Sequence, residues 1–368
     1  MPARTGRAIA IIVFMLLLHA AAPARAATLG EANRQASAFV QATMRAQRIP
    51  GLQIAVIQDG QVVLSESHGF ANVENHVPVT RDTRFPINSA TKAFTGVAIM
   101  QLVEAGRVDL AAPLSRYVAG VPQDWQDIRV RQLLAHTSGL PDLVDEHGLV
   151  GGGSEHDAWQ AIRQRPVDAP AGERFVYNQT NYALLAQIIA GQSGLPYEAH
   201  VARHQFSVAG MPSSTFGDSY DLIPGAATLY SYFPRKTDAQ DTPERLSHWF
   251  HDMPYGLWAG GGIQTTADDV AHWLIALSAG RLISKANVRE MWTPERLNRG
   301  TDGRWGAGWP VLATTPHRQI AGMGGARAAF IVYPDEGLAI VVLTNLVGAN
   351  PQDFIPAIAA YYLPSRTP

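Results

Sequence analysis

The 368-residue sequence contains no cysteine. This absence excludes disulfide bonds, thiol nucleophiles and zinc sites built from cysteine. Charged residues are few, at 16% of the chain, and the net charge of −2 gives no basic surface for nucleic acid or an anionic membrane. Repeats, charge blocks and low-complexity tracts are also missing. With 46% hydrophobic residues, the chain has enough apolar material for the core of one large globular unit.

The N-terminal segment has the pattern of a targeting signal. Arg4 and Arg7 precede an apolar stretch, Ala8–Leu18, and small residues follow up to Ala26. This order is typical of a secretory signal peptide over residues 1–26, and we expect cleavage after Ala26. The stretch is short for a membrane span, so an uncleaved anchor is the weaker alternative. The mature chain is therefore expected to be periplasmic or secreted, with no stable membrane span after cleavage.

Strand signals gather at the two ends of the chain. Leu52–Gln58 and Gln61–Ser67 are joined by Asp59-Gly60, a strong two-residue hairpin signal. Near the other end, Ala328–Tyr333 and Leu338–Leu343 flank a second turn. The middle of the chain has mostly helical patterns and loops.

These patterns predict an α+β fold. Strands from both chain ends form one antiparallel sheet, flanked by terminal helices at Thr28–Arg48 and Pro351–Tyr362, with a helical lobe inserted. Within a single domain, residues 27–88 and 280–368 form the α/β lobe and residues 89–279 the mainly helical lobe. A catalytic cleft is expected between the two lobes.

A short motif carries the candidate chemistry. Ser89 and Lys92 have a Ser-x-x-Lys spacing, and the apolar run Ala93–Ala105 follows directly. This predicts a buried helix with Ser89 at its N-terminus and Lys92 one turn on, on the same face. A serine hydroxyl needs a base to become a nucleophile, and burial disfavours the charged form of a lysine that could be this base. The alternative is a serine that caps a helix beside a solvated lysine, but lysine in an apolar helix is costly without a role.

Five further segments follow Phe85–Lys92 in order and belong to the same pattern. They are Asp109–Tyr117, Val130–Pro141, Phe175–Leu185, Gly260–Asp269 and Val341–Asn345. Together they resemble the serine β-lactamases and penicillin-binding proteins, and in particular the group of class C β-lactamases, D-Ala-D-Ala carboxypeptidases and serine esterases. The likeness covers nearly the whole mature chain. It implies a β-lactamase/transpeptidase-like fold and a serine hydrolase.

The resemblance also implies roles for individual residues. Ser89 would be acylated by a carbonyl substrate, and Lys92 and Tyr177 would share proton transfer. The backbone N–H groups of Ser89 and Ala326 would form an oxyanion hole, and water would then cleave the acyl-enzyme. Outside this motif, Tyr177 would be better explained as a core tyrosine.

The sequence departs from the family pattern at two positions. Gln179 stands where the tyrosine motif usually has asparagine, and it keeps an amide on a longer side chain. Met323, before Gly324 and Gly325, stands where the third motif usually has lysine or histidine. Methionine brings no charge, so we expect a more apolar site with weaker recognition of a substrate carboxylate. Arg327 could replace the missing charge, and we include all five residues as candidates for substrate binding.

Three functions stay open from the sequence. An exported esterase or amidase for small acyl substrates is favoured, a β-lactamase or D-Ala-D-Ala carboxypeptidase is the alternative, and a catalytically weak binding protein of the same fold is the third. The expected partner is a small ester, amide or lactam, with a cell-wall peptide as a further candidate and no nucleic acid. No cofactor or metal is expected, because the histidine pairs His200/His204 and His248/His251 lack the glutamate of the zinc-protease helix motif.

Overall fold

The computed structural model describes residues 21–233 and 245–363, with side chains of the first helix described from Leu29 onward. The expected signal peptide falls mainly on residues 1–20, outside these ranges. Helix α1 runs from Ala21 to Gln47 and leads into the first strand. Among the described residues, no helix combines the length and the hydropathy needed to cross a membrane.

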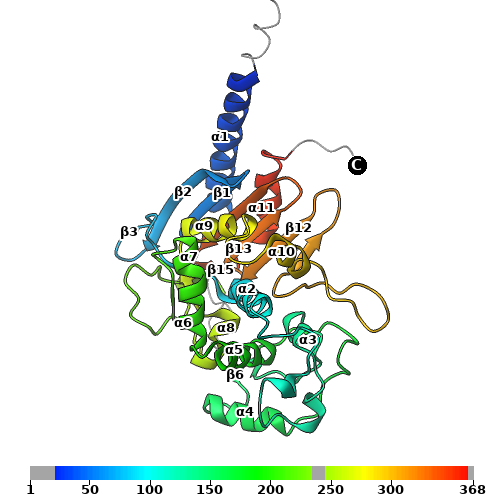
Figure 1. The fold of residues 1–368 in the computed structure, drawn as a ribbon. Helices are drawn as coiled ribbons and strands as arrows, with labels where there is room; N and C mark the ends of the chain where they lie inside the picture. The colour runs from blue at the N-terminus through cyan, green and yellow to red at the C-terminus, as the bar shows by residue number, and fades with distance from the viewer. Residues whose placement is uncertain (1–20, 234–244, 364–368) are drawn as a thin grey trace, which may run out of the picture.

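A seven-stranded antiparallel sheet, ordered β11-β12-β13-β14-β1-β2-β3, forms the centre of the fold (Figure 1). Its strands come from both ends of the chain, which confirms the predicted α+β architecture. Their bounds are Gly51–Gln58 (β1), Gln61–Asn72 (β2), Val77–Pro78 (β3), Val311–Ala313 (β11), Gln319–Gly324 (β12), Ala328–Tyr333 (β13) and Leu338–Thr344 (β14). Both predicted hairpins are present, as β1-β2 and β13-β14.

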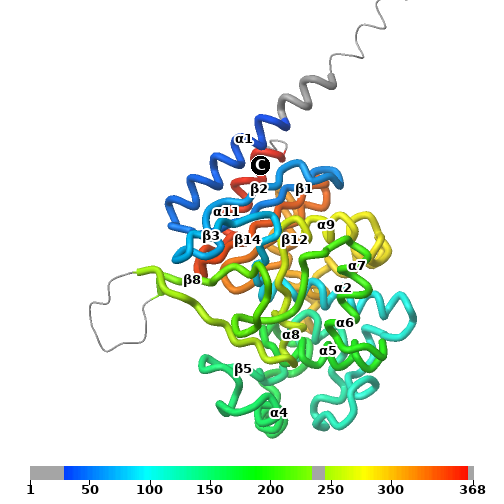
Figure 2. The backbone as a smooth tube through the Cα atoms, turned by 90° about the vertical axis from the view of Figure 1, so that its left-hand side faces the viewer, coloured from blue at the N-terminus to red at the C-terminus, as the bar shows by residue number. Residues whose placement is uncertain are grey.

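Helices cover both faces of this sheet, as Figure 2 shows for α1 and α11 on one side of the strands and α9 on the other. Because side chains alternate along a strand, Ile54 and Val56 of β1 join the apolar cluster under α1 and α11 (Pro351–Ala359). Ala55 and Ile57 join the larger cluster that contains α2 (Thr91–Glu104) and α9 (Ala267–Ser278). Helix α9 packs on β1 and β14, so the layer that covers the sheet begins before the lobe boundary suggested from the sequence.

The other helices and short strands form the lobe inserted between the two parts of the sheet (Figure 1). The exceptions are α10, which packs beside α9, and β15, which follows β14 and pairs with β8. The helices are Val130–Leu134 (α3), Glu155–Arg163 (α4), Thr180–Ser193 (α5), Tyr197–Val201 (α6), Ser207–Ala209 (α7), Trp258–Gly261 (α8) and Lys285–Met291 (α10), with a π-helical turn at Ala202–Phe206 (η4) and 3₁₀ turns at Asn88–Ala90 (η1), Leu114–Arg116 (η2), Gln123–Trp125 (η3) and Tyr255–Leu257 (η5). The short strands are Phe85–Pro86 (β4), Val144–Asp145 (β5), Gly148–Leu149 (β6), Thr215–Phe216 (β7), Tyr230–Ser231 (β8), Ser247–His248 (β9), Ile263–Thr265 (β10) and Leu346–Val347 (β15). Helix α2 lies between this lobe and the sheet, because it packs on α5 and α8 and also meets β12.

Candidate active site

Ser89 lies in η1, the turn that leads directly into α2. Asn88, just before it, has a φ of 44°, in the left-handed region that asparagine tolerates better than most residues. Ser89 is half-buried, whereas α2 is buried over most of its length. The chain therefore turns sharply at Asn88, and this turn presents a serine at the start of a buried helix, as the sequence predicts.

Lys92 is fully buried, and its side-chain nitrogen is held by three oxygen atoms. Nζ donates to the carbonyl oxygen of Gly260 at 2.8 Å, to Oε1 of Gln179 at 3.0 Å and to Oγ of Ser89 at 3.3 Å. A protonated amine has three N–H donors, and this site offers an acceptor for each of them. The amine is thereby fixed beside the serine hydroxyl, and Gln179 fills its place in the tyrosine motif by binding this lysine.

Tyr177 approaches the same serine from the other side. Its hydroxyl lies 2.8 Å from Oγ of Ser89, and Nζ of Lys92 lies 4.8 Å from the centre of its ring. With 37% of Tyr177 exposed, this edge of the site is open to solvent. The structure thus brings together the three residues that the resemblance assigns to catalysis, and the serine hydroxyl touches both groups that could take its proton.

The ring of His136 packs against the ring of Tyr177, with the two ring centres 4.3 Å apart. Its Nδ1 accepts from the backbone N–H of Asn178 at 3.3 Å and from Nδ2 of Asn181 at 3.1 Å. Burial, together with the nearby charge of Lys92, lowers the pKa of His136 well below its usual value. The ring is therefore neutral and acts as a packing support for the tyrosine.

Asp142 fixes the backbone on the other side of Tyr177. Its Oδ1 accepts from the N–H of Gln179 at 2.8 Å, one residue before α5 begins. Burial raises the pKa of this carboxyl group, and the hydrogen bonds it accepts oppose that rise. Asp142 therefore helps to orient the residue that binds Lys92.

The end of strand β12 passes directly beside the nucleophile. A Cβ atom placed on Gly324 would lie 2.5 Å from the backbone nitrogen of Ser89 and closer still to the carbonyl oxygen of Ile87. Gly322, two residues earlier, faces the ring of Phe330 on the same side of the sheet. Only glycine fits at Gly324, because any side chain would occupy the backbone of the turn that carries Ser89.

The position of Met323 differs from the sequence prediction. It lies between two glycines that face α2, so its side chain points to the opposite face, where it packs against the cluster under α1 and α11. The expectation that Met323 makes the substrate site more apolar is not supported by this placement. The inner face of β12 carries no cation because Gly322 and Gly324, which have no side chains, occupy it.

Arg327 also lies elsewhere than a substrate-binding role requires. Its side chain is only 2% exposed, and its guanidinium lies against Gly325, beside the side chain of Asn88. Burial lowers its pKa to about 10. Nε and Nη2 are closed to solvent, so a substrate has no direct access to them in this conformation.

The turn between β12 and β13 has the geometry of an N–H donor loop. Gly325 and Ala326 have φ values of 58° and 54°, and the carbonyl oxygen of Ala326 accepts from the N–H groups of Gly348 and Asn350 at 3.0 Å each. Within the part of the chain that the structure describes, the N–H of Ala326 has no hydrogen-bond acceptor. This donor is the partner that the resemblance assigns to the N–H of Ser89 in an oxyanion hole.

Sequence reasoning missed three contributors to this site. The carbonyl oxygen of Gly260 binds Lys92, Asp142 orients Gln179, and Trp305 packs edge-on against Tyr177 at 5.7 Å. The Gly-rich segment around Gly260 was a signal, but no pattern reports which backbone carbonyl meets an amine. Within the described ranges, no group of three or more histidine, aspartate or glutamate side chains could hold a metal ion.

Comparison with known proteins finds relatives both by sequence and by structure. PbpX of Bacillus subtilis (strain 168), named as a penicillin-binding protein, is 30% identical over 297 residues, which is 80% of this chain and 70% of PbpX. Protein Flp of Staphylococcus aureus (strain MW2) is 27% identical over 252 residues, 66% of this chain, and the match spans about half, 48%, of Flp. The structure of the octameric penicillin-binding protein homologue from Pyrococcus abyssi is 28% identical with a TM-score of 0.71, and it covers 89% of this chain and 76% of the other.

The fold and these relatives define a class, the hydrolases with a β-lactamase fold. Residues 36–361 match the sequence pattern of the β-lactamase family. The chain therefore belongs to the β-lactamase family.

Proposed function

We propose that the chain is an exported serine hydrolase that forms an acyl-enzyme on Ser89 and acts on small, neutral esters or amides. One observation carries this proposal, namely that Oγ of Ser89 lies within hydrogen-bond distance of both Nζ of Lys92 and the hydroxyl of Tyr177. A serine placed between an amine and a phenol at the start of a buried helix matches the requirements of an activated nucleophile, once either group is deprotonated and can accept the serine proton. A purely structural serine has no need of them.

In the proposed reaction, Oγ of Ser89 forms a bond to the substrate carbonyl carbon while its proton passes to the Lys92–Tyr177 pair. The carbonyl oxygen becomes an oxyanion that accepts from the N–H groups of Ser89 and Ala326. Collapse of this intermediate breaks the bond to the alcohol or amine, which leaves with the proton that Tyr177 returns. Water then repeats the sequence at the acyl-enzyme and releases the acid.

The preference for neutral acyl groups is supported by the inner face of β12. Gly322 and Gly324 occupy that face, and the guanidinium of Arg327 is buried, so neither offers a cation to a substrate carboxylate. The second candidate is a β-lactamase or D-Ala-D-Ala carboxypeptidase, because PbpX, at 30% identity, is named as a penicillin-binding protein. A cell-wall peptide would then be the partner.

A paired assay tests the proposal. The mature protein, residues 27–368, is given short-chain p-nitrophenyl esters, nitrocefin and a D-Ala-D-Ala peptide. We expect ester hydrolysis to exceed turnover of the other two, and Ser89→Ala to abolish it, while Ser115→Ala, an exposed serine in another part of the helical lobe, leaves it unchanged. Faster turnover of nitrocefin or the peptide would replace the first candidate with the second.

Export has its own test. Cells that express the full chain are fractionated, and the N-terminus of the protein is read by mass spectrometry. The proposal expects a periplasmic or secreted protein that begins at Ala27. A cytoplasmic protein that retains residues 1–26 would contradict export without affecting the proposed chemistry.

A further inference from the structure

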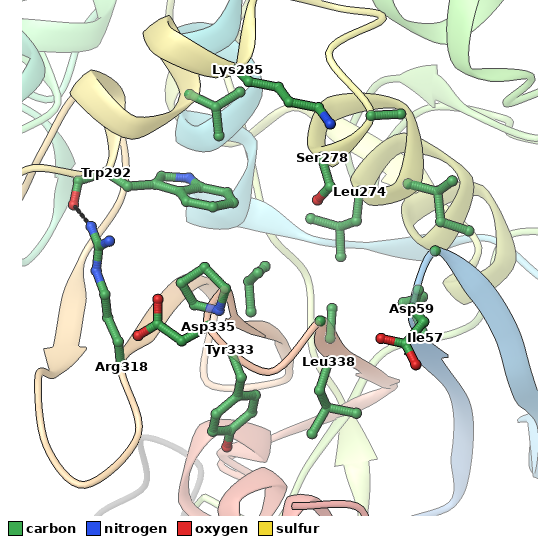
Figure 3. A pocket seen from close by; sticks show the side chains of 18 of the residues that line it. Ile57, Asp59, Leu274, Ser278, Lys285, Trp292, Arg318, Tyr333, Asp335 and Leu338 are labelled. Atoms are coloured by element: carbon green, nitrogen blue, oxygen red, sulfur yellow. Dashed lines mark hydrogen bonds between the residues drawn. The ribbon is translucent and has the colours of Figure 1, made fainter.

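A cavity of about 550 Å³ lies at the end of the sheet opposite Ser89 (Figure 3). It lies between the β1-β2 turn, the β13-β14 turn, α9 and α10. We call it the hairpin-end cavity, defined by Ile57, Leu274, Lys285, Arg289, Trp292 and Val332. Strand β13 separates the two sites, because Ala328 pairs with Gly324 and Tyr333 reaches the cavity, about 17 Å further along the strand. The proposed hydrolysis does not use this cavity.

The inner wall of the cavity is apolar. Ile57, Val332 and Leu274 are buried side chains from two strands and α9, on the face of the sheet that α9 covers, and the indole of Trp292 extends across one side (Figure 3). The volume falls within the range of small-molecule sites, about 300–1,000 Å³. Such a wall favours a ligand with an aliphatic or aromatic body, because burying apolar surface is the main source of its binding free energy.

Two cations stand at the entrance on the α10 side. Lys285 and Arg289 are exposed, lie one turn apart on the same face of α10, and both line the cavity. Among the described residues, neither side chain has a hydrogen-bonded or ionic partner. Like charges four residues apart on a helix repel each other, and a bound anion would remove that repulsion. Figure 3 shows the Lys285 side chain extending over the cavity.

The other charged groups limit how a ligand can lie. Arg318 donates through Nη2 to the carbonyl oxygen of Trp292 at 2.9 Å, and this bond holds its guanidinium at the backbone of Trp292. Asp59 and Asp335 lie at the two hairpin turns, and they would repel an anionic group placed at that end. A single negative group is therefore favoured beside α10, with the apolar body directed toward the sheet.

We propose that the hairpin-end cavity binds an amphipathic monocarboxylate, with its carboxylate between Lys285 and Arg289 and its hydrocarbon chain against Ile57, Leu274 and Trp292. Trp292 also begins a chain of packed aromatic rings. It lies edge-on to Trp309 at 5.7 Å, Trp309 stacks with Trp273 at 5.7 Å, and Trp273 stacks on Phe94 of α2 at 3.8 Å. Binding is therefore reported by indole fluorescence.

Titration calorimetry of the mature protein with sodium decanoate, below its micelle concentration, tests the site, with decanol as the neutral control. We expect saturable binding of one decanoate. The double variant Lys285→Gln/Arg289→Gln should weaken it about tenfold, because two surface charge contacts are lost, whereas Arg203→Gln, an arginine on η4, should not. Ser278→Trp places a large ring at an exposed position on the cavity edge, so it should abolish binding without loss of the fold.

The outcomes separate clearly. Decanoate that binds equally well to the wild type and to both cavity variants sits elsewhere, and the proposal is then wrong. Decanol that binds as tightly as decanoate would remove the role of the two cations and overturn the proposal as stated. Absence of heat and of any fluorescence change would overturn it as well. None of these results depends on whether Ser89 is catalytic.

Discussion

Replacement of Gly324 by alanine gives the sharpest test of how the sheet supports the nucleophile. The added Cβ would lie 2.5 Å from the backbone nitrogen of Ser89 and 2.9 Å from that of Ala90, and it would overlap the carbonyl oxygen of Ile87. Ordinary contacts are longer by about 1 Å, so β12 and η1 must separate by a displacement on the order of 1 Å. Both backbones are held by hydrogen bonds, and neither can rotate away as a side chain could.

A displacement of this size has a large expected cost in rate. Misplacing reacting groups by about 1 Å lowers the rate about 100-fold, or about 2.7 kcal/mol in activation free energy. Overpacking should lower the free energy of unfolding by about 1–3 kcal/mol, which leaves a chain of this size folded. We therefore expect kcat/KM for p-nitrophenyl butyrate to fall about 100-fold while the circular dichroism spectrum is retained.

Gly191→Ala is the matched control. Gly191 lies on α5, is exposed, and a Cβ there would meet nothing within 4 Å. Alanine should therefore keep wild-type activity and raise stability by up to about 1 kcal/mol. Wild-type activity in Gly324→Ala would refute the placement of β12 against Ser89, and so would an equal loss in both variants.

Three further predictions concern separate parts of the structure. Gln179→Leu removes one of the three acceptors of Lys92, so kcat should fall about tenfold in steady-state assays. Gln179→Asn keeps an amide and should restore part of the lost kcat. An unchanged kcat in Gln179→Leu would contradict the contact between Gln179 and Lys92. The Met323 side chain packs away from the site, so Met323→Ala should leave the ratio of ester to nitrocefin turnover unchanged. In urea titrations the same variant should lower the free energy of unfolding by about 1–2 kcal/mol. A changed turnover ratio would contradict this placement. Burial lowers the pKa of His200 to about 4, so the unfolded chain takes up a proton below pH 6.5 before the folded chain does, and stability is lost as the pH falls from about 6.5 to 4. His200→Gln should reduce that loss by about 1 kcal/mol in unfolding curves at pH 7 and 4.5, and an equal loss in both proteins would show that this histidine is protonated when folded.

Much of the architecture could be predicted because its signals are local. Asp59-Gly60 fixes a hairpin, and the unbroken apolar run from Ile54 to Ile57 identifies a strand with two buried faces. The spacing of Ser89 and Lys92 also fixes their relation, because a helix puts residues three apart on one face. These features depend only on nearby residues, so the sequence alone was enough.

The parts that could not be predicted depend on register and on long-range packing. Met323 aligns with the third motif by sequence, but a strand sends adjacent side chains to opposite faces, so a shift of one residue decides whether a side chain meets substrate or core. The burial of Arg327 and the carbonyl of Gly260 at Lys92 arise from segments far apart in the chain. No local pattern encodes such a meeting.

The central claim is that the hydroxyl of Ser89 is a nucleophile, and covalent labelling measures this directly. The mature protein is treated with a fluorophosphonate, digested, and analysed by mass spectrometry. A single phosphonylated peptide that carries the adduct on Ser89, and that disappears in Ser89→Ala, is the predicted result. Folded protein that stays unlabelled, or that carries the adduct on another serine, would contradict it.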